Sequence, residues 1–192
     1  AFADFAITSG SQNIAIETAA LRTATTQRLL VAIGDSALYW NGQGAASATD
    51  AVENTAVGGF ALLNNTTGNQ NTAVGTYALA NTTTYSENTA LGAYALSGAT
   101  AGSGNVGVGV EAGNAVHGGG NTMVGTRASN VGGTFPSHYN VAIGTNTLLV
   151  VGSMNNNTAV GSFAAGSVVN TLTNTTSLGY NATASADNRK RV

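Results

Sequence analysis

Cysteine, proline and charged residues are scarce in this 192-residue sequence. Cysteine is absent, which excludes disulfide bonds, thiolate metal sites and cysteine nucleophiles. Charged residues make up 7 % of the chain, against about 25 % in an ordinary globular domain, and the net charge is −2. Because phosphate binding needs clustered lysine and arginine, this composition argues against a nucleic-acid partner. No apolar run approaches the roughly 20 residues of a transmembrane helix, so we expect no membrane insertion.

Glycine, in contrast, is abundant, with 26 glycines and a single proline. This balance favours many tight turns over a flexible linker. Hydrophobic residues make up 43 % of the chain and aromatic residues 6 %, and much of the hydrophobic fraction is alanine and valine. The composition therefore predicts a thin core lined by small side chains.

A nine-residue motif, Asn-x-Ala-Val/Ile-Gly-x-x-Ala-Leu, recurs along the chain with a period close to 17 residues. Three clear copies are NTAVGGFAL at 54–62, NTAVGTYAL at 71–79 and NTALGAYAL at 88–96. The copies begin at residues 13, 30, 54, 71, 88, 105, 121, 140, 157 and 175. One longer step leaves residues 39–53 as a predicted protruding loop. We expect a single repetitive domain over residues 1–192 with one coil per copy.

A 17-residue unit is too short for a helix pair, because helical repeats need about 33 residues or more. Thr55, Ala56 and Val57 show the alternating pattern of a β-strand, and the glycine that follows turns the chain. We expect a second short strand at 60–62 and at the equivalent residues of later copies. Successive coils would pair as parallel strands about 4.8 Å apart. The sequence thus predicts an all-β parallel β-solenoid.

Two columns of equivalent residues are predicted to stack along the rod axis. One is a ladder of side-chain amides, formed by Asn54, Asn71, Asn88, Asn105, Asn121, Asn140 and Asn157. The other is a face of alanines that includes Ala56, Ala73 and Ala90. Small side chains let another backbone approach closely. We therefore expect several chains, three in a narrow rod, to pack their alanine faces around one axis as a homotrimer.

Segments such as NVAIG and NTAVG resemble the head repeats of trimeric autotransporter adhesins. The longer form NTAVGxxAL, with NATASADNR near the end, resembles repeats of bacteriophage tail-fibre proteins and related bacterial surface proteins. The resemblance covers about residues 13–189. It implies a left-handed β-roll that trimerises, and a location on a virion, outside the cell or on the bacterial cell surface. It transfers no catalytic residue, and we expect no cofactor.

Four side chains are candidate receptor contacts, for a cell-surface polysaccharide or a protein. Tyr39 and Trp40 lie in the long loop, although they would equally serve to anchor that loop to the rod. His117 and His138 fall in predicted inter-strand loops, where a lone histidine is more simply a surface polar residue.

Aromatic residues also recur at one repeat position, as Phe60, Tyr77 and Tyr94. Such a column would offer a platform for sugar rings. The leucine two positions further on instead favours rings inside the coil or at a seam between chains. No spacing indicates a metal site, and carboxylates are too sparse for a glycosidase pair.

These observations favour a structural or adhesive fibre segment rather than an enzyme. It would be a rigid rod with receptor-binding loops at 39–53, 114–120 and 130–139. The alternative is a subunit of a self-assembling extracellular filament, joined head to tail through the solenoid ends or an exchanged N-terminal strand at 1–7. A polysaccharide-degrading β-helix enzyme is the third hypothesis.

Overall fold

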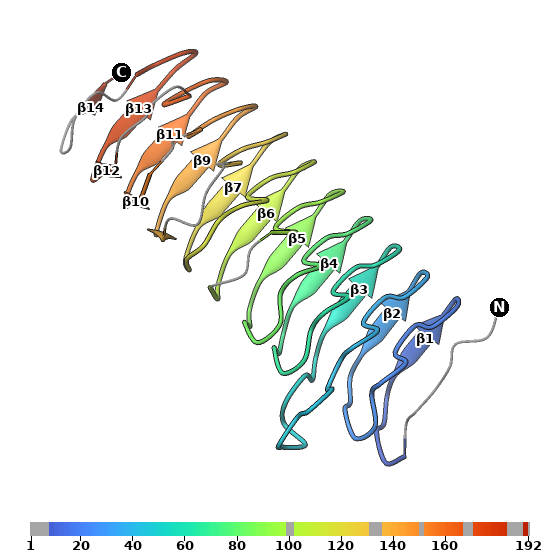
Figure 1. Cartoon of the computed structure of the whole chain (residues 1–192). Helices are drawn as coiled ribbons and strands as arrows, with labels where there is room; N and C mark the ends of the chain where they lie inside the picture. The colour runs from blue at the N-terminus through green and yellow to red at the C-terminus, as the bar shows by residue number, and fades with distance from the viewer. Residues whose placement is uncertain are drawn as a thin grey trace.

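The computed structural model describes residues 8–98, 102–130, 136–149, 152–166, 171–183 and 190–191, and these form an elongated stack of coils (Figure 1). Strands and turns make up this part of the chain, and it contains no helix. One strand from each of the ten repeat copies pairs with its counterpart in the next coil, and a short strand after the last copy completes an eleven-stranded parallel sheet over about nine turns. The predicted all-β parallel β-solenoid is confirmed at this level.

The strands of this sheet are three residues long, except for the last. They are β1 (Ile14–Ile16), β2 (Val31–Ile33), β3 (Thr55–Val57), β4 (Thr72–Val74), β5 (Thr89–Leu91), β6 (Val106–Val108), β7 (Thr122–Val124), β9 (Val141–Ile143), β11 (Thr158–Val160), β13 (Thr176–Leu178) and β14 (Lys190–Arg191). A second, three-stranded parallel sheet lies toward the C-terminal end. It comprises β8 (Ser137–His138), β10 (Met154–Asn155) and β12 (Leu172–Thr173).

The register of the large sheet keeps equivalent repeat positions side by side. Ala56 pairs with Ala73, and Ala73 pairs with Ala90. The register also holds where the repeat length changes, since Thr122 pairs with both Val106 and Val141. Length differences between copies are therefore absorbed in the loops and not in the sheet.

The predicted second strand at 60–62 is wrong, because these residues and their equivalents form turns. Phe60 and Leu62 have φ of +61° and +50°, on either side of Ala61. The Phe60 N–H donates back to the Asp35 carbonyl of the preceding coil (2.9 Å), while the Leu62 N–H donates forward to the Ala78 carbonyl (3.0 Å). An L-amino acid in the left-handed region costs about 1–2 kcal/mol. In this turn the conformation directs the N–H of Phe60 to the preceding coil and that of Leu62 to the following coil, so both form hydrogen bonds.

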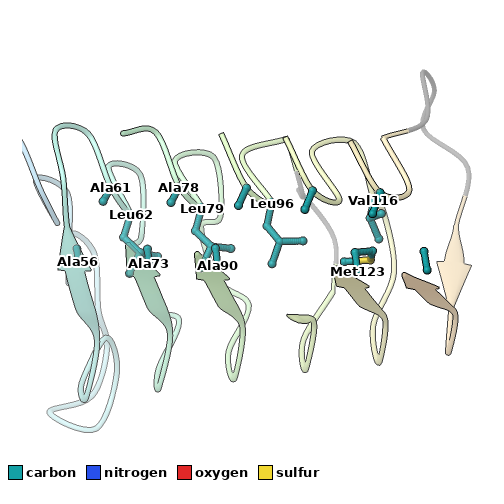
Figure 2. Close-up of a cluster of buried hydrophobic side chains, with 14 of the residues drawn as sticks. Ala56, Ala61, Leu62, Ala73, Ala78, Leu79, Ala90, Leu96, Val116 and Met123 are labelled. Carbon is teal, nitrogen blue, oxygen red and sulfur yellow. The ribbon is translucent and has the colours of Figure 1, made fainter. Parts of the chain in front are cut away.

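In the first five coils the core contains one alanine from the strand and an Ala-Leu pair from the turn, and later coils vary this set, as with the buried Met123 at the strand position of β7. Ala56, Ala61 and Leu62 are fully buried, and Figure 2 shows such side chains between the strand layer and the turn layer. The alanine column therefore faces the interior of its own coil, and the prediction that it packs against another chain is wrong. The physical reason is the flatness of the coil, in which only a methyl group fits opposite the leucine.

Glycine follows most strands of the large sheet because this position needs both a positive φ and room for the backbone of the next coil. Gly92, which follows β5, has φ +137°, and a Cβ at this position would lie 2.5 Å from the Gly109 carbonyl oxygen in the next coil. Equivalent glycines with φ between +112° and +134° follow other strands: Gly34, Gly58, Gly75, Gly109, Gly125, Gly144, Gly161 and Gly179. Glu17 takes this position after β1, with φ +88°.

Candidate functional site

The asparagine column forms a buried ladder of hydrogen bonds along the rod axis. At Asn88, the backbone N–H and the side-chain Nδ2 both donate to Oδ1 of Asn71, at 3.0 and 3.2 Å. The same double contact recurs at Asn105, Asn121, Asn140 and Asn157. Thr175 ends the ladder by donating its N–H and its hydroxyl to Asn157 Oδ1. Because these amides bond to one another, the ladder links successive coils. It is therefore not a candidate binding site.

The ladder is interrupted in the second coil, where Leu30 stands at the asparagine position. Asn41, at the start of the long loop, is fully buried and takes over the missing contact. Its Oδ1 accepts from the Nδ2 atoms of Asn54 (3.3 Å) and Asn65 (2.7 Å), and its own Nδ2 donates to the Ala51 carbonyl (2.8 Å). The loop is therefore fastened to the solenoid at its base.

Trp40, the neighbour of this anchor, lines an open groove of about 480 Å³. The other residues of the groove are uncharged and polar, and come from the loop and the next two coils: Gln43, Asn64, Thr66, Asn81 and Thr83. We call this the Trp40 groove. Tyr39 packs edge-on against the indole, with 4.5 Å between ring centroids. Arg22 donates to the Tyr39 hydroxyl and lies over the same ring, so the aromatic pair is braced from the first coil.

The polar wall of the Trp40 groove repeats with the coils. Asn64 Nδ2 donates to Asn81 Oδ1 (3.3 Å), and the Thr66 hydroxyl donates to the Thr83 carbonyl (2.9 Å). Each pair joins residues 17 positions apart, one coil from the next. The wall therefore presents amides and hydroxyls in rows that follow the rod axis.

The two histidines lie in neighbouring coils, well along the sheet from the Trp40 groove. His117 forms a bridge with Pro136, and its Nδ1 lies 2.8 Å from the Ala115 carbonyl. His138 belongs to strand β8 and not to a loop, and its Nδ1 accepts from the Gly119 N–H (3.1 Å). Both side chains are half-buried and bonded to local backbone. The structure does not bring them together with Tyr39 and Trp40.

The aromatic column lies outside the core. Phe60 stacks on Tyr77 with 4.8 Å between centroids, and Tyr77 stacks on Tyr94 with 5.2 Å. Tyr94 is 44 % exposed, while the alanine and leucine that follow it are buried. The expectation of rings inside the coil is wrong, because the left-handed turn residue points its side chain outward and the next two residues fill the interior.

Two columns of side chains form the outer face of the large sheet, on either side of the buried alanines. One column mixes threonine with aliphatic residues: Ile14, Val31, Thr55, Thr72, Thr89, Val106, Thr122, Val141, Thr158 and Thr176. The other is aliphatic throughout: Ile16, Ile33, Val57, Val74, Leu91, Val108, Val124, Ile143, Val160 and Leu178. We call these two columns the outer sheet face. Its residues are half-buried or exposed from β1 to β13, and none is charged.

Ionisable groups are thinly spread over the described surface. Glu111 accepts from Asn130 Nδ2 (2.9 Å) and pairs with Arg127 at 3.4 Å in an exposed contact. Nowhere in the described ranges do three or more histidine, aspartate or glutamate side chains gather closely enough to hold a metal ion. The same residues form no helix long and apolar enough to cross a membrane.

Comparisons with known proteins add no relative. No family model matches the chain, and neither the curated proteins nor the solved structures give a significant match. The outer sheet face and the Trp40 groove are therefore the two features of the described surface that bear on function.

Proposed function

We propose that this chain is a rigid segment of an extracellular or virion fibre, and that copies associate through the outer sheet face. The single observation that carries the proposal is the column of ten aliphatic side chains on that face. The left-handed coil and the trimer implied by the resemblance to adhesin and tail-fibre repeats belong to this proposal. The role is structural and adhesive, not catalytic.

The outer sheet face supports self-association because its chemistry differs from that of a solvated surface. Leu91 is 49 % exposed, and Ile14 and Ile16 are each 51 % exposed. Contiguous apolar surfaces of this kind usually mark interaction sites. The aliphatic column of the face also runs unbroken from β1 to β13, so an identical rod laid against it meets an aliphatic side chain in every coil. A second copy of this chain is therefore the partner with the matching shape and length.

The adhesive half of the proposal rests on the long loop. Its base is fastened by Asn41, while Gln43 and the segment 46–49 are exposed. A fixed base with an exposed tip suits contact with a cell-surface polysaccharide or protein. The predicted loop at 130–139 falls partly on residues 131–135, which lie outside the described residues.

Sedimentation of the purified chain tests the self-association. We expect one species of three times the 19.0 kDa chain mass. The Leu91→Glu variant should sediment as a monomer, because a buried unpaired carboxylate in the seam is costly. Leu29→Glu is the matched control, since Leu29 is 43 % exposed and glutamate occurs naturally at the equivalent positions Glu53 and Glu87. A monomeric native chain, or a Leu91→Glu variant that still associates, contradicts the proposal.

The same measurement decides the filament alternative. Open-ended growth would give a broad, concentration-dependent mass distribution instead of one species. The predicted exchange of an N-terminal strand at 1–7 lies outside the described residues. Release of reducing sugar from a bacterial polysaccharide would instead support the third hypothesis, a β-helix enzyme.

A further inference from the structure

We propose that the Trp40 groove binds a neutral saccharide. This inference deepens the adhesive half of the proposed function by naming the chemical class of the ligand. It does not depend on self-association, since the lining residues of the groove come from one chain.

The absence of charge in the lining determines which ligands fit. Every polar residue of the groove is an amide or an alcohol, so it offers both hydrogen-bond donors and acceptors without a net field. Arg22, the cation associated with this region, is directed to Tyr39 and is not among the lining residues. An anionic ligand such as a phosphate or a sialic acid would find no charged partner in the groove. A ligand rich in neutral hydroxyl groups would find several.

Trp40 supplies the apolar surface that a pyranose ring needs. The indole is half-buried and braced by Tyr39, so its orientation is set before a ligand arrives. Pyranose rings have one face of C–H groups that packs on an aromatic face, while their hydroxyls point to the rim. Gln43 and the Asn64–Asn81 pair line the same groove and offer amide groups to such hydroxyls.

The two rows of polar residues favour an oligosaccharide over a single sugar. Asn64 and Thr66 belong to one coil, and Asn81 and Thr83 belong to the next, about 4.8 Å further along the axis. A chain of sugar units that starts on Trp40 would meet amide and hydroxyl groups in each coil that it crosses. Asn81 and Thr83 are exposed and available for such contacts.

A protein partner fits this groove less well. Protein interfaces concentrate their binding energy in clusters of buried aromatic and aliphatic anchors. In the Trp40 groove the indole is the one apolar side chain of the lining, and the rest is polar. We therefore expect the groove to bind a saccharide and not a protein.

Trp40 is the single tryptophan of the chain, so its fluorescence reports on the groove directly. The 192-residue chain is titrated with cellohexaose, maltohexaose and chitohexaose, and with sialyllactose as a charged probe. We expect a saturable change in emission with at least one neutral hexasaccharide at millimolar concentration or below, and no change with sialyllactose. Failure of all three neutral probes, or a response to the charged probe alone, overturns the inference.

Variants locate the binding. Asn81→Ala should weaken binding at least tenfold by fluorescence, and Thr84→Ala, an exposed neighbour outside the groove, should leave it unchanged. Trp40→Ala, followed by calorimetry, should abolish binding. Tyr180→Ala is its control, because Tyr180 is a 79 % exposed aromatic in a distant coil. Retained binding in Trp40→Ala, or equal loss in the controls, places the saccharide elsewhere and contradicts the proposal.

Sedimentation of the same samples separates the two proposals. A trimer that binds no sugar supports the fibre proposal and overturns the saccharide site. A monomer that binds sugar through Trp40 supports the saccharide site and overturns the self-association. Binding of unrelated unfolded peptides to the groove with loss in Trp40→Ala, without any sugar response, would favour the protein-ligand outcome.

Discussion

At the scale of single residues, the backbone conformation is the most demanding feature of this solenoid. Each complete coil has several positions with positive φ, of which one is normally glycine and others are occupied by ordinary residues such as Tyr77 and Leu79. Side chains rarely adopt this region without compensation. The compensation here is an inter-coil hydrogen bond, as from the Tyr77 N–H to the Gly59 carbonyl (3.0 Å).

Two glycine-to-alanine substitutions compare the loss of stability caused by a steric clash with the loss caused by a positive φ alone. We expect Gly92→Ala to lower the free energy of unfolding by about 4 kcal/mol or more, because the new Cβ would strike the Gly109 backbone. Gly44→Ala is the control, since Gly44 has φ +74° but open space around it. It should cost about 1 kcal/mol. Chemical denaturation measures both, and equal losses would show that the close approach of coils contributes nothing.

Ser177 offers a stabilising substitution. It takes the position of the buried alanines, and its hydroxyl has no hydrogen-bond partner among the described residues. We expect Ser177→Ala to raise the free energy of unfolding by about 1 kcal/mol, since a buried unpaired hydroxyl is removed. The half-buried Ser162→Ala should leave it nearly unchanged. A loss of stability in Ser177→Ala would mean that the hydroxyl has a partner in the folded protein.

At the scale of elements, the asparagine ladder and the three-residue strands stabilise each other. A strand of three residues is shorter than the usual five or six and makes few hydrogen bonds. The ladder adds two bonds per coil immediately before the strand, as at Asn105 on Asn88 Oδ1. These bonds are buried, so loss of one partner leaves the other unsatisfied.

Removal of one ladder residue tests this coupling. In Asn88→Ala, the Asn105 N–H loses its acceptor, and Asn105 Nδ2 keeps only its bond to the Gly118 carbonyl (2.9 Å). We expect the free energy of unfolding to fall by about 3 kcal/mol, from buried groups left unpaired. Asn64→Ala removes an exposed amide pair and should cost less than about 1 kcal/mol. A comparable small loss in both variants would show that water replaces the ladder bond.

The sequence predicted the strands of the large sheet, but the prediction of which side chains point into the coil was wrong. Period and alternation are enough to place three-residue strands at equivalent positions of each copy. They do not decide whether Ala56 or its neighbours Thr55 and Val57 point inward, because both choices bury apolar atoms. The second strand was wrong for a related reason: nothing in Phe-Ala-Leu signals a left-handed φ.

The candidate site was predicted in part. Trp40 stood out as the lone tryptophan in a long loop. Its partners Asn64 and Asn81 did not, because they belong to later coils and meet it only through the stacking register. Asn41 was missed as well, although the leucine at position 30 was the available signal that another residue must complete the ladder.

At the scale of the whole molecule, the rod is held together almost without charge. The exposed Glu111–Arg127 pair is the kind of contact that contributes about 0–1 kcal/mol. Burial of small apolar groups and hydrogen bonds between coils carry the stability instead. The same holds for the proposed seam between chains, which is aliphatic.

Ionic strength should therefore have little effect. We expect the unfolding midpoint and the sedimentation pattern to stay nearly constant from low salt to about 0.5 M NaCl, a range over which surface ion pairs are strongly screened. Thermal unfolding and sedimentation across this range measure both. A marked loss of stability or association with salt would indicate that charged groups carry the assembly.

The anchoring of the long loop has a consequence for sequence change over time. Asn41 and the Ala51 carbonyl close the loop at its base, ten positions apart. The segment between them, beyond Gly42, can then accept insertions or new residues while the solenoid behind it keeps its register. Residues 43–50 can therefore change by mutation, and the rod can acquire new binding preferences in this way. A foreign loop grafted at the same place would do the same without a change to the solenoid.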